Sequence, residues 1–174
     1  MVKPFDFTRG AHEGTRHLDA PVAPAILKPL GVTSPVEDRI PRNWAAGEDL
    51  DRYRVITGPA DRKRSPDITR PAMVVLHGVG YACIFAIGTL LDLPAWDAAH
   101  RYGDRFPYSF HARIDIWVPD VKDGPKTSGL VEKATLGHLQ RGGDFAKLSD
   151  REFNRIRNAL LERPTVQVRD GGGS

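Results

Sequence analysis

Residues 108–118, YSFHARIDIWV, alternate between apolar and polar side chains along their whole length. The apolar positions are Tyr108, Phe110, Ala112, Ile114, Ile116 and Val118, and the positions between them are Ser109, His111, Arg113, Asp115 and Trp117. Successive side chains of a β-strand point to opposite faces of its sheet. A period of two therefore predicts a strand with one buried face and one face that meets solvent or a ligand.

Further strands are predicted from short apolar segments bounded by turn residues. Residues 52–57 (RYRVIT) predict a first strand, and 165–169 (TVQVR) predict a short last one. Residues 73–76 (MVVL) and 81–91 (YACIFAIGTLL) predict two strands joined by the turn HGVG.

The three glycines of this apolar region raise a question of packing. Gly78 and Gly80 are expected in the turn, where glycine takes a positive φ without steric cost. Gly88 lies inside the second predicted strand, which a glycine weakens. We therefore expect a bulge at Gly88, or the close approach of a helix or a bound base.

One capped helix is predicted after residue 149. Ser149 is a good N-cap, and Glu152 lies three residues on, at the spacing of a capping box. Pro164 lies just beyond the expected end. The apolar positions between them share one face, which we expect to dock on the sheet: Phe153, Ile156 and Leu160.

The two ends of the chain differ in composition from the part between them. Residues 1–41 carry six prolines without a sustained periodicity, which predicts a Pro-rich arm that is extended or disordered. Residues 42–170 are expected to form one domain, and 171–174 (GGGS) have the composition of a linker. A strand-rich order with one or two helices predicts an α+β fold built on a small β-barrel.

Composition is that of an ordinary globular protein, with 40% apolar and 27% charged residues. The apolar region is interrupted by His77 and by glycines, so no membrane span is expected. The first residues, MVKPFDFTRG, lack the apolar segment of a signal peptide, which makes a cytoplasmic location the expectation. Cys83 is the only cysteine of the sequence, which excludes an internal disulfide and a zinc site built from cysteines.

The net charge of +3 is compatible with a nucleic-acid partner. Its distribution is more informative, because six cations face two acids between residues 52 and 70. The cations are Arg52, Arg54, Arg62, Lys63, Arg64 and Arg70. A solvated loop and a phosphate-binding loop both fit this excess.

Known catalytic motifs are absent from the sequence. It contains no GxSxG, no P-loop, no GxGxxG that opens a helix and no HExxH. The six histidines do not have the spacing of metal ligands. We expect a non-catalytic protein that needs no metal or other cofactor; the alternative is an enzyme, such as a nuclease, whose active site is assembled from distant residues.

Tryptophans provide flat surfaces on which a base can stack. Trp96 lies in a predicted loop, where a core role is less natural. Trp44, just ahead of the first predicted strand, and Trp117, near the end of the alternating strand, fit either core packing or contact with a ligand.

Three stretches, taken in order, resemble a known family. They are MVVLHGVGYACIFAIGTLLDLP (73–94), FPYSFHARIDIWV (106–118) and LQRGGDFAKLSDREFNRI (139–156). Their succession resembles the EVE domain and its relative the YTH domain, both of the PUA-like superfamily. The resemblance covers residues 44–161, and it lies in the order of elements more than in any single motif.

The resemblance implies a PUA-like, EVE-type twisted β-barrel flanked by short helices. It also implies that the chain holds one modified base in an aromatic pocket. We expect 5-methylcytosine or 5-hydroxymethylcytosine in DNA, flipped out of the duplex at a cost of a few kcal/mol that stacking offsets. Such a chain would be the sensor of a modification-dependent restriction or related system, working with a nuclease or ATPase module.

Site residues follow from the resemblance and from the nearby polar groups. Trp44 and Trp96 correspond to the walls of the pocket, and Arg141 to a phosphate contact. The other candidates for the pocket are Asn43, Tyr81, Asp92 and Ser109, and those for phosphate binding are Arg62, Lys63, Arg64, Arg101 and Arg105.

Three alternatives stay open at this point. The same fold can read a modified RNA nucleotide such as N6-methyladenine. The chain can be a nuclease with a site that is not recognisable from sequence. It can also be a protein-interaction module that uses the Pro-rich arm.

Overall fold

The structure is a computed structural model, which describes residues 25–31, 39–57, 72–97, 108–140 and 145–170. Within these ranges the strands are β1 Ala25–Leu30, β2 Tyr53–Thr57, β3 Met73–Gly78, β4 Cys83–Leu90, β5 Ala95–Trp96, β6 Tyr108–Trp117, β7 Ala146–Leu148 and β8 Gln167–Val168. The helices are α1 Lys133–Gln140 and α2 Asp150–Leu161, with short 3-10 helices η3 Trp44–Gly47 and η4 Val121–Asp123.

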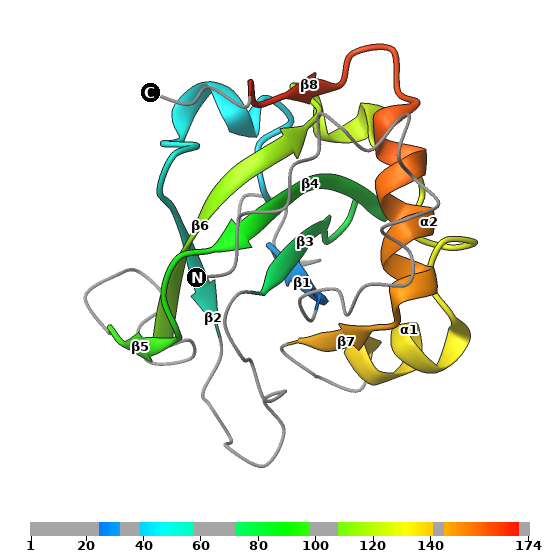
Figure 1. Cartoon of the computed structure of the whole chain (residues 1–174), viewed down its shortest axis with the longest axis horizontal. Coiled ribbons are helices and arrows are strands. Elements are labelled where there is room, and N and C mark those ends of the chain that lie inside the picture. Colours follow the sequence, from blue (N-terminus) through cyan, green and yellow to red (C-terminus); the bar gives the residue numbers. More distant parts are fainter. Residues whose placement is uncertain (1–24, 32–38, 58–71, 98–107, 141–144, 171–174) are drawn as a thin grey trace.

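The strands form one mixed sheet that curls into a half-barrel (Figure 1). Its order is β2-β6-β4-β3-β1-β7, and β5 and β8 add to β6. Strands β1 and β3 are parallel, whereas the other described pairs are antiparallel. The coarse expectation of an α+β fold with a barrel-like sheet is therefore confirmed.

Strand β6 is the longest strand described, and it confirms the alternating pattern. It pairs with β2, β4, β5 and β8. Phe110, Ala112 and Ile114 are completely buried, whereas His111 and Arg113 between them are partly exposed. The alternation fails at Ser109 and Asp115, which are both buried; Asp115 is the extra residue of a bulge in the β4–β6 pairing.

Strand β1 corrects the expectation for the N-terminal arm. It lies between β3 and β7, with Ala25 opposite both Met73 and Leu148. The domain boundary expected at residue 41 therefore comes after a strand that already belongs to the sheet. Lys28 and Pro29 interrupt the apolar residues of AILKPL, so the segment gave no strand signal. Residues 1–24 and 171–174 lie outside the described residues.

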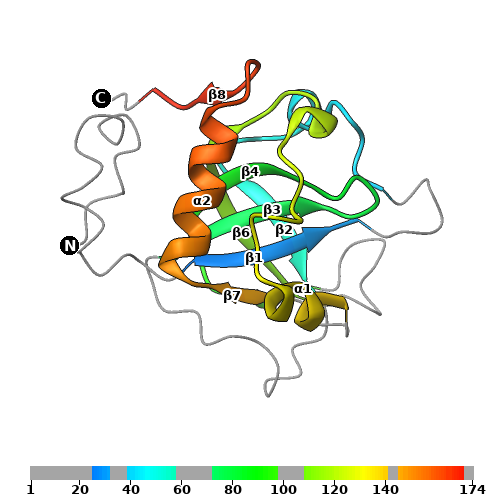
Figure 2. The same ribbon diagram turned by 90° about the vertical axis from the view of Figure 1, so that its right-hand side faces the viewer.

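The core fills the inside of the curled sheet. The rings of Phe110 on β6 and Phe145 beside β7 lie 5.9 Å apart, although their strands are far apart in the order of the sheet. On the other side, α2 packs against β4, β6 and β7 and runs across the strands (Figure 2). Its buried residues include Phe153, Ile156 and Leu160, as the helical periodicity predicts.

The N-terminus of α2 has the predicted capping box and a further link to α1. The Oγ of Ser149 accepts from the backbone N of Glu152 at 3.1 Å, and Glu152 Oε1 accepts from the backbone N of Ser149 at 3.1 Å. The second oxygen, Oε2, accepts from the backbone N of Glu132 and from Thr135 Oγ1. One buried carboxylate therefore joins the starts of both helices.

The β3–β4 turn uses its two glycines differently. Gly80 has a φ of 87°, as expected for the turn. Gly78 is instead the last residue of β3, where an added Cβ would lie 3.1 Å from Val121 and 3.2 Å from the Tyr81 ring. Close packing, and not a positive φ, therefore favours glycine at position 78.

Neither described helix has the length and hydropathy that are required to cross a bilayer.

Candidate functional site

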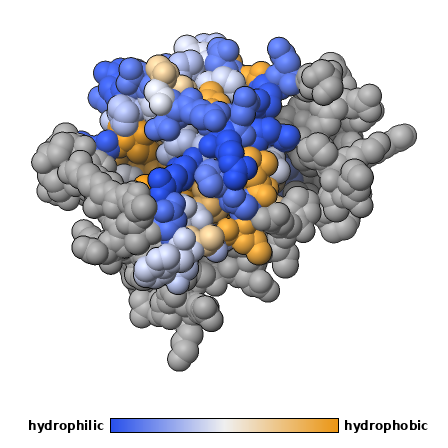
Figure 3. Space-filling view, turned by 90° about the vertical axis from the view of Figure 1, so that its left-hand side faces the viewer, coloured by the Kyte–Doolittle hydropathy of each residue, from blue (hydrophilic) through white to orange (hydrophobic). Residues whose placement is uncertain are grey.

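The outer face of the sheet at β6 and β2 is polar. Ser109, His111 and Arg113 have the parity opposite to the buried positions of β6. Arg54 of β2 pairs with His111, and Thr89 of β4 pairs with Arg113, so both add to the same face. We call this surface the polar face; it comprises Arg52, Arg54, Thr89, Asp92, Asp97, Ser109, His111, Arg113 and Asp115. Hydrophilic residues cover the middle of the adjoining side of the molecule (Figure 3).

Asp92 links Arg52 to His111 on the polar face. Its Oδ1 accepts from the backbone N of His111 at 2.5 Å, and its Oδ2 lies 2.8 Å from His111 Nδ1. Oδ2 also accepts from Arg52 Nη2, at a longer 3.4 Å. Burial alone would raise the pKa of Asp92, but the hydrogen bonds from His111, with the charges of His111 and Arg52, hold that pKa below its ordinary value.

Asp97 makes a similar connection between Arg54 and Ser109. Its Oδ2 accepts from Arg54 Nη2 and, at 3.0 Å, from Ser109 Oγ. Arg54 Nε is buried and has no hydrogen-bond partner among the described residues. Asp97 immediately follows Trp96, so Arg54 is tied to the segment that carries this tryptophan.

Asp115 forms the most buried pair of the polar face. Its Oδ1 accepts from Arg113 Nε at 2.8 Å, and its Oδ2 accepts from Thr89 Oγ1 at 2.7 Å. The side chain of Asp115 is 6% exposed, so removal of Arg113 would leave a shielded carboxylate without its counter-charge. We interpret this pair as part of the fold.

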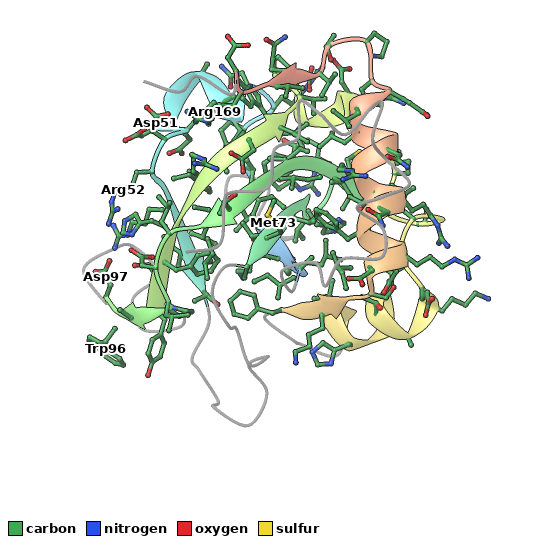
Figure 4. The ribbon with its side chains drawn as sticks, in the orientation of Figure 1. Asp51, Arg52, Met73, Trp96, Asp97 and Arg169 are labelled. Atoms are coloured by element: carbon green, nitrogen blue, oxygen red, sulfur yellow. The ribbon has the colours of Figure 1, made fainter. Side chains whose placement is uncertain are left out.

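Trp96 is the most exposed large apolar side chain among the described residues, at 69%. It lies in β5 opposite Tyr108, whose ring meets the indole edge to face with centroids 5.5 Å apart. In Figure 4 it projects at the end of the sheet, on the same side of the molecule as Asp97 and Arg52. The indole thus offers an open surface held in place by one aromatic neighbour.

Trp44 is a core residue, contrary to its expected place in a base pocket. It is 2% exposed, and its ring contacts Tyr53 and Phe85 with centroids 5.1 and 4.9 Å away. Burial raises the pKa of Tyr53 to about 12, as expected for a phenol shielded from water. With both neighbours in place, a base cannot reach the Trp44 ring.

Trp44 and Trp96 are not brought together. Tyr53, beside Trp44, pairs with Ala112, whereas Trp96 pairs with Tyr108, which is four residues away along β6. At about 3.3 Å per residue this is a distance of about 13 Å. The described residues therefore do not form the two-tryptophan cage that the resemblance implies.

The other predicted pocket residues divide between two places. Asp92 and Ser109 lie on the polar face, as described above. Asn43 is an exposed residue that precedes η3, close to Trp44 in the chain. Tyr81 lies in the β3–β4 turn, where its hydroxyl donates to the carbonyl of Ile40 at 2.6 Å. The predicted phosphate contacts lie outside the described residues: Arg62, Lys63, Arg64, Arg101, Arg105 and Arg141.

Several residues of the polar face were not predicted as site residues. His111 and Arg113 could have been found from the parity of the alternating strand, because they occupy its non-core positions. Asp97 could have been found only as the neighbour of Trp96. The pairing of each guanidinium with a particular carboxylate depends on strand register and was not accessible from sequence.

Metal binding receives no support from the residues that the structure describes. No three His, Cys, Asp or Glu side chains among them are grouped closely enough to hold an ion. The carboxylates of the polar face instead pair with arginines.

Comparison of the chain with protein-family models, with curated proteins and with solved structures gives no match.

Proposed function

We propose that this chain is a non-catalytic nucleic-acid-binding module that holds a base on Trp96. The observation that supports the proposal is the 69% exposure of an indole whose orientation is fixed by Tyr108. An exposed tryptophan adds nothing to the core, and its flat aromatic surface is suited to stacking a base.

The base must be accessible from one face. Bases inside a duplex are covered on both faces by their neighbours, so the ligand is a single strand or a base flipped out of a duplex. Stacking on one aromatic side chain contributes about 1–3 kcal/mol per base, which is enough to offset the cost of flipping a weakly held base.

The ligand that we propose is DNA carrying 5-methylcytosine or 5-hydroxymethylcytosine, bound by the chain as the sensor of a modification-dependent restriction system. This finer proposal rests on the sequence resemblance. One buried methyl group contributes about 0.8 kcal/mol, so stacking on a single wall favours the methylated base only about fourfold. Stronger discrimination requires further groups around the base.

Fluorescence anisotropy at fixed salt tests the proposal. The panel contains single strands and duplexes with cytosine, 5-methylcytosine or 5-hydroxymethylcytosine, and RNA strands with adenine or N6-methyladenine. We expect Trp96→Ala to weaken binding of the preferred strand about tenfold or more, because it removes the stacking contact. Leu93→Ala is the matched control, since Leu93 is a nearby apolar residue that is 47% exposed.

The outcomes separate the levels of the proposal. Unchanged binding by Trp96→Ala on every strand would contradict base stacking at this residue. Equal affinity for modified and unmodified strands, with loss in Trp96→Ala, would reject modified-base reading alone. Preference for N6-methyladenine RNA would favour the RNA alternative.

A further inference from the structure

We propose that Arg52 and Arg54 bind two phosphates of the same nucleic acid, and that Asp92 and Asp97 occupy these guanidinium groups while no nucleic acid is bound. The inference rests on the proposed function, because it assigns the backbone contacts of the strand whose base stacks on Trp96. It names a binding site on described residues: Arg52 and Arg54 begin the group of cations at residues 52–70, whose other members lie outside the described residues.

The two arginines are placed as a pair. They are two positions apart, so their Cα atoms lie at most about 7 Å from each other. Both reach the connection that follows β4, Arg52 through Asp92 and Arg54 through Asp97. This arrangement suits successive phosphates of one extended strand.

Arg52 and Arg54 can leave Asp92 and Asp97 without depriving either carboxylate of all its hydrogen bonds. Asp92 keeps two shorter hydrogen bonds from His111, at 2.5 and 2.8 Å, when the 3.4 Å contact with Arg52 is broken. Asp97 keeps the hydroxyl of Ser109. Each carboxylate therefore retains a hydrogen-bond donor, so the free-energy cost of losing the arginine is small.

Exposure sets the energetic balance of this exchange. The side chains of Arg52 and Arg54 are 59% and 38% exposed, and solvent screens ion pairs of this kind so that they contribute little. A phosphate accepts two parallel hydrogen bonds from a guanidinium and releases bound counterions. The arginines thus gain by changing from carboxylate to phosphate.

The path of the bound nucleic acid follows from the geometry of the β-sheet. Trp96 ends β5 and Asp97 follows it, and their partners Tyr108 and Ser109 are successive residues of β6, whose side chains point to opposite faces of the sheet. Trp96 packs on Tyr108, and Asp97 bonds to Ser109 and Arg54 on the polar face. A nucleic acid with its base on Trp96 must cross the end of the sheet at β5 to bring its phosphates to Arg54 and then Arg52.

The salt dependence of binding isolates the phosphate contacts. The probe is a fluorescein-labelled single-stranded DNA oligonucleotide, and the logarithm of the association constant is plotted against the logarithm of salt concentration. Each lost phosphate contact to a single strand should make the slope about 0.7 less steep. We expect this change in Arg52→Gln and Arg54→Gln, and about twice the change in the double variant.

Arg42→Gln is the matched control. Arg42 is 58% exposed and pairs with Asp120 at 2.5 Å, outside the polar face, so its loss should leave the slope unchanged. Asp92→Asn and Asp97→Asn should bind more tightly than wild type at low salt, because they remove a competing carboxylate. Thermal melting of each variant shows whether it folds. If Arg54→Gln does not fold, the salt dependence of Arg52→Gln alone tests the phosphate site.

Failure of this inference differs from failure of the proposed function. A wild-type slope in Arg52→Gln, together with weakened binding in Trp96→Ala, would overturn the phosphate site and leave base stacking intact. Unchanged binding in Trp96→Ala would overturn the proposed function, on which the phosphate site depends.

Discussion

The carbonyl oxygen of Arg113 occupies the space in which a side chain at Gly88 would begin. A Cβ on Gly88 would lie 2.6 Å from this oxygen, because a bulge in the β4–β6 pairing brings the two backbones together. The close approach that the sequence indicates at Gly88 therefore comes from the neighbouring strand. It does not come from a helix or from a bound base.

Gly88→Ala should destabilise the fold by about 1–3 kcal/mol, because the backbone of β6 has to move away from the new methyl group. Gly47→Ala is the control, since a Cβ there meets nothing within 4 Å. Urea unfolding followed by circular dichroism measures both. Equal free energies of unfolding for the two variants would contradict the crowding at Gly88.

Trp44→Ala should lower the stability of the fold strongly, and Trp96→Ala should hardly change it. Loss of the buried Trp44 should cost about 3–5 kcal/mol of stability, because it opens a cavity beside Tyr53 and Phe85. Loss of the exposed Trp96 should change stability by less than about 0.5 kcal/mol. A stable Trp44→Ala variant in a denaturant titration would show that this ring is not part of the core.

Glu152→Ala should lower the free energy of unfolding by more than about 2 kcal/mol. The change leaves the backbone N–H groups of Glu132 and Ser149 without their acceptor, at the junction of α1 and α2. Arg151→Ala, at an exposed position of the same helix turn, is the control and should be near neutral. A similar loss in both variants would contradict a special role of the shared carboxylate.

Acid should destabilise the protein partly through His77. Burial lowers the pKa of His77 from 6.5 to about 4, and its Nδ1 lies 2.6 Å from Thr127 Oγ1. Between these two values the unfolded chain takes up a proton that the folded chain does not, so stability is lost as the pH falls from 6.5 towards 4. The full loss approaches about 3 kcal/mol.

Denaturant unfolding at several pH values compares wild type with His77→Gln. The glutamine retains a polar group near Thr127 but has no proton to bind in this range, so the stability of the variant should fall less between pH 6.5 and 4. Parallel curves for the two proteins would rule out His77 as the source.

The elements with complete local signals could be predicted from sequence. The alternation of β6 specifies a strand and its buried side, and the capping box from Ser149 to Glu152 specifies the start of α2. These signals are local, since each depends on residues within one strand or one helix turn. The exposure of Trp96 was expected from its place in a predicted loop, although the structure places it in the two-residue strand β5.

The remaining features depend on contacts between distant segments. Trp44 carries no local signal of burial, because Phe85 reaches it only after the sheet has formed. The arginine–aspartate pairs likewise depend on the register of β2 against β6. Strand β1 is hidden by Pro29, which lies beyond the residues of β1 that pair on both sides, where a missing N–H is tolerated.

The position of β1 determines when the fold can be completed during synthesis. Its partner in β7 is more than a hundred residues further along the chain, so β1 cannot complete its pairing until residues 146–148 have left the ribosome. Until then the edge of β1 that faces β7 is unpaired and can pair with other chains. Deleting residues 1–40 would remove β1 and leave the edges of β3 and β7 unpaired, so such a truncation would report on aggregation rather than on the role of an arm.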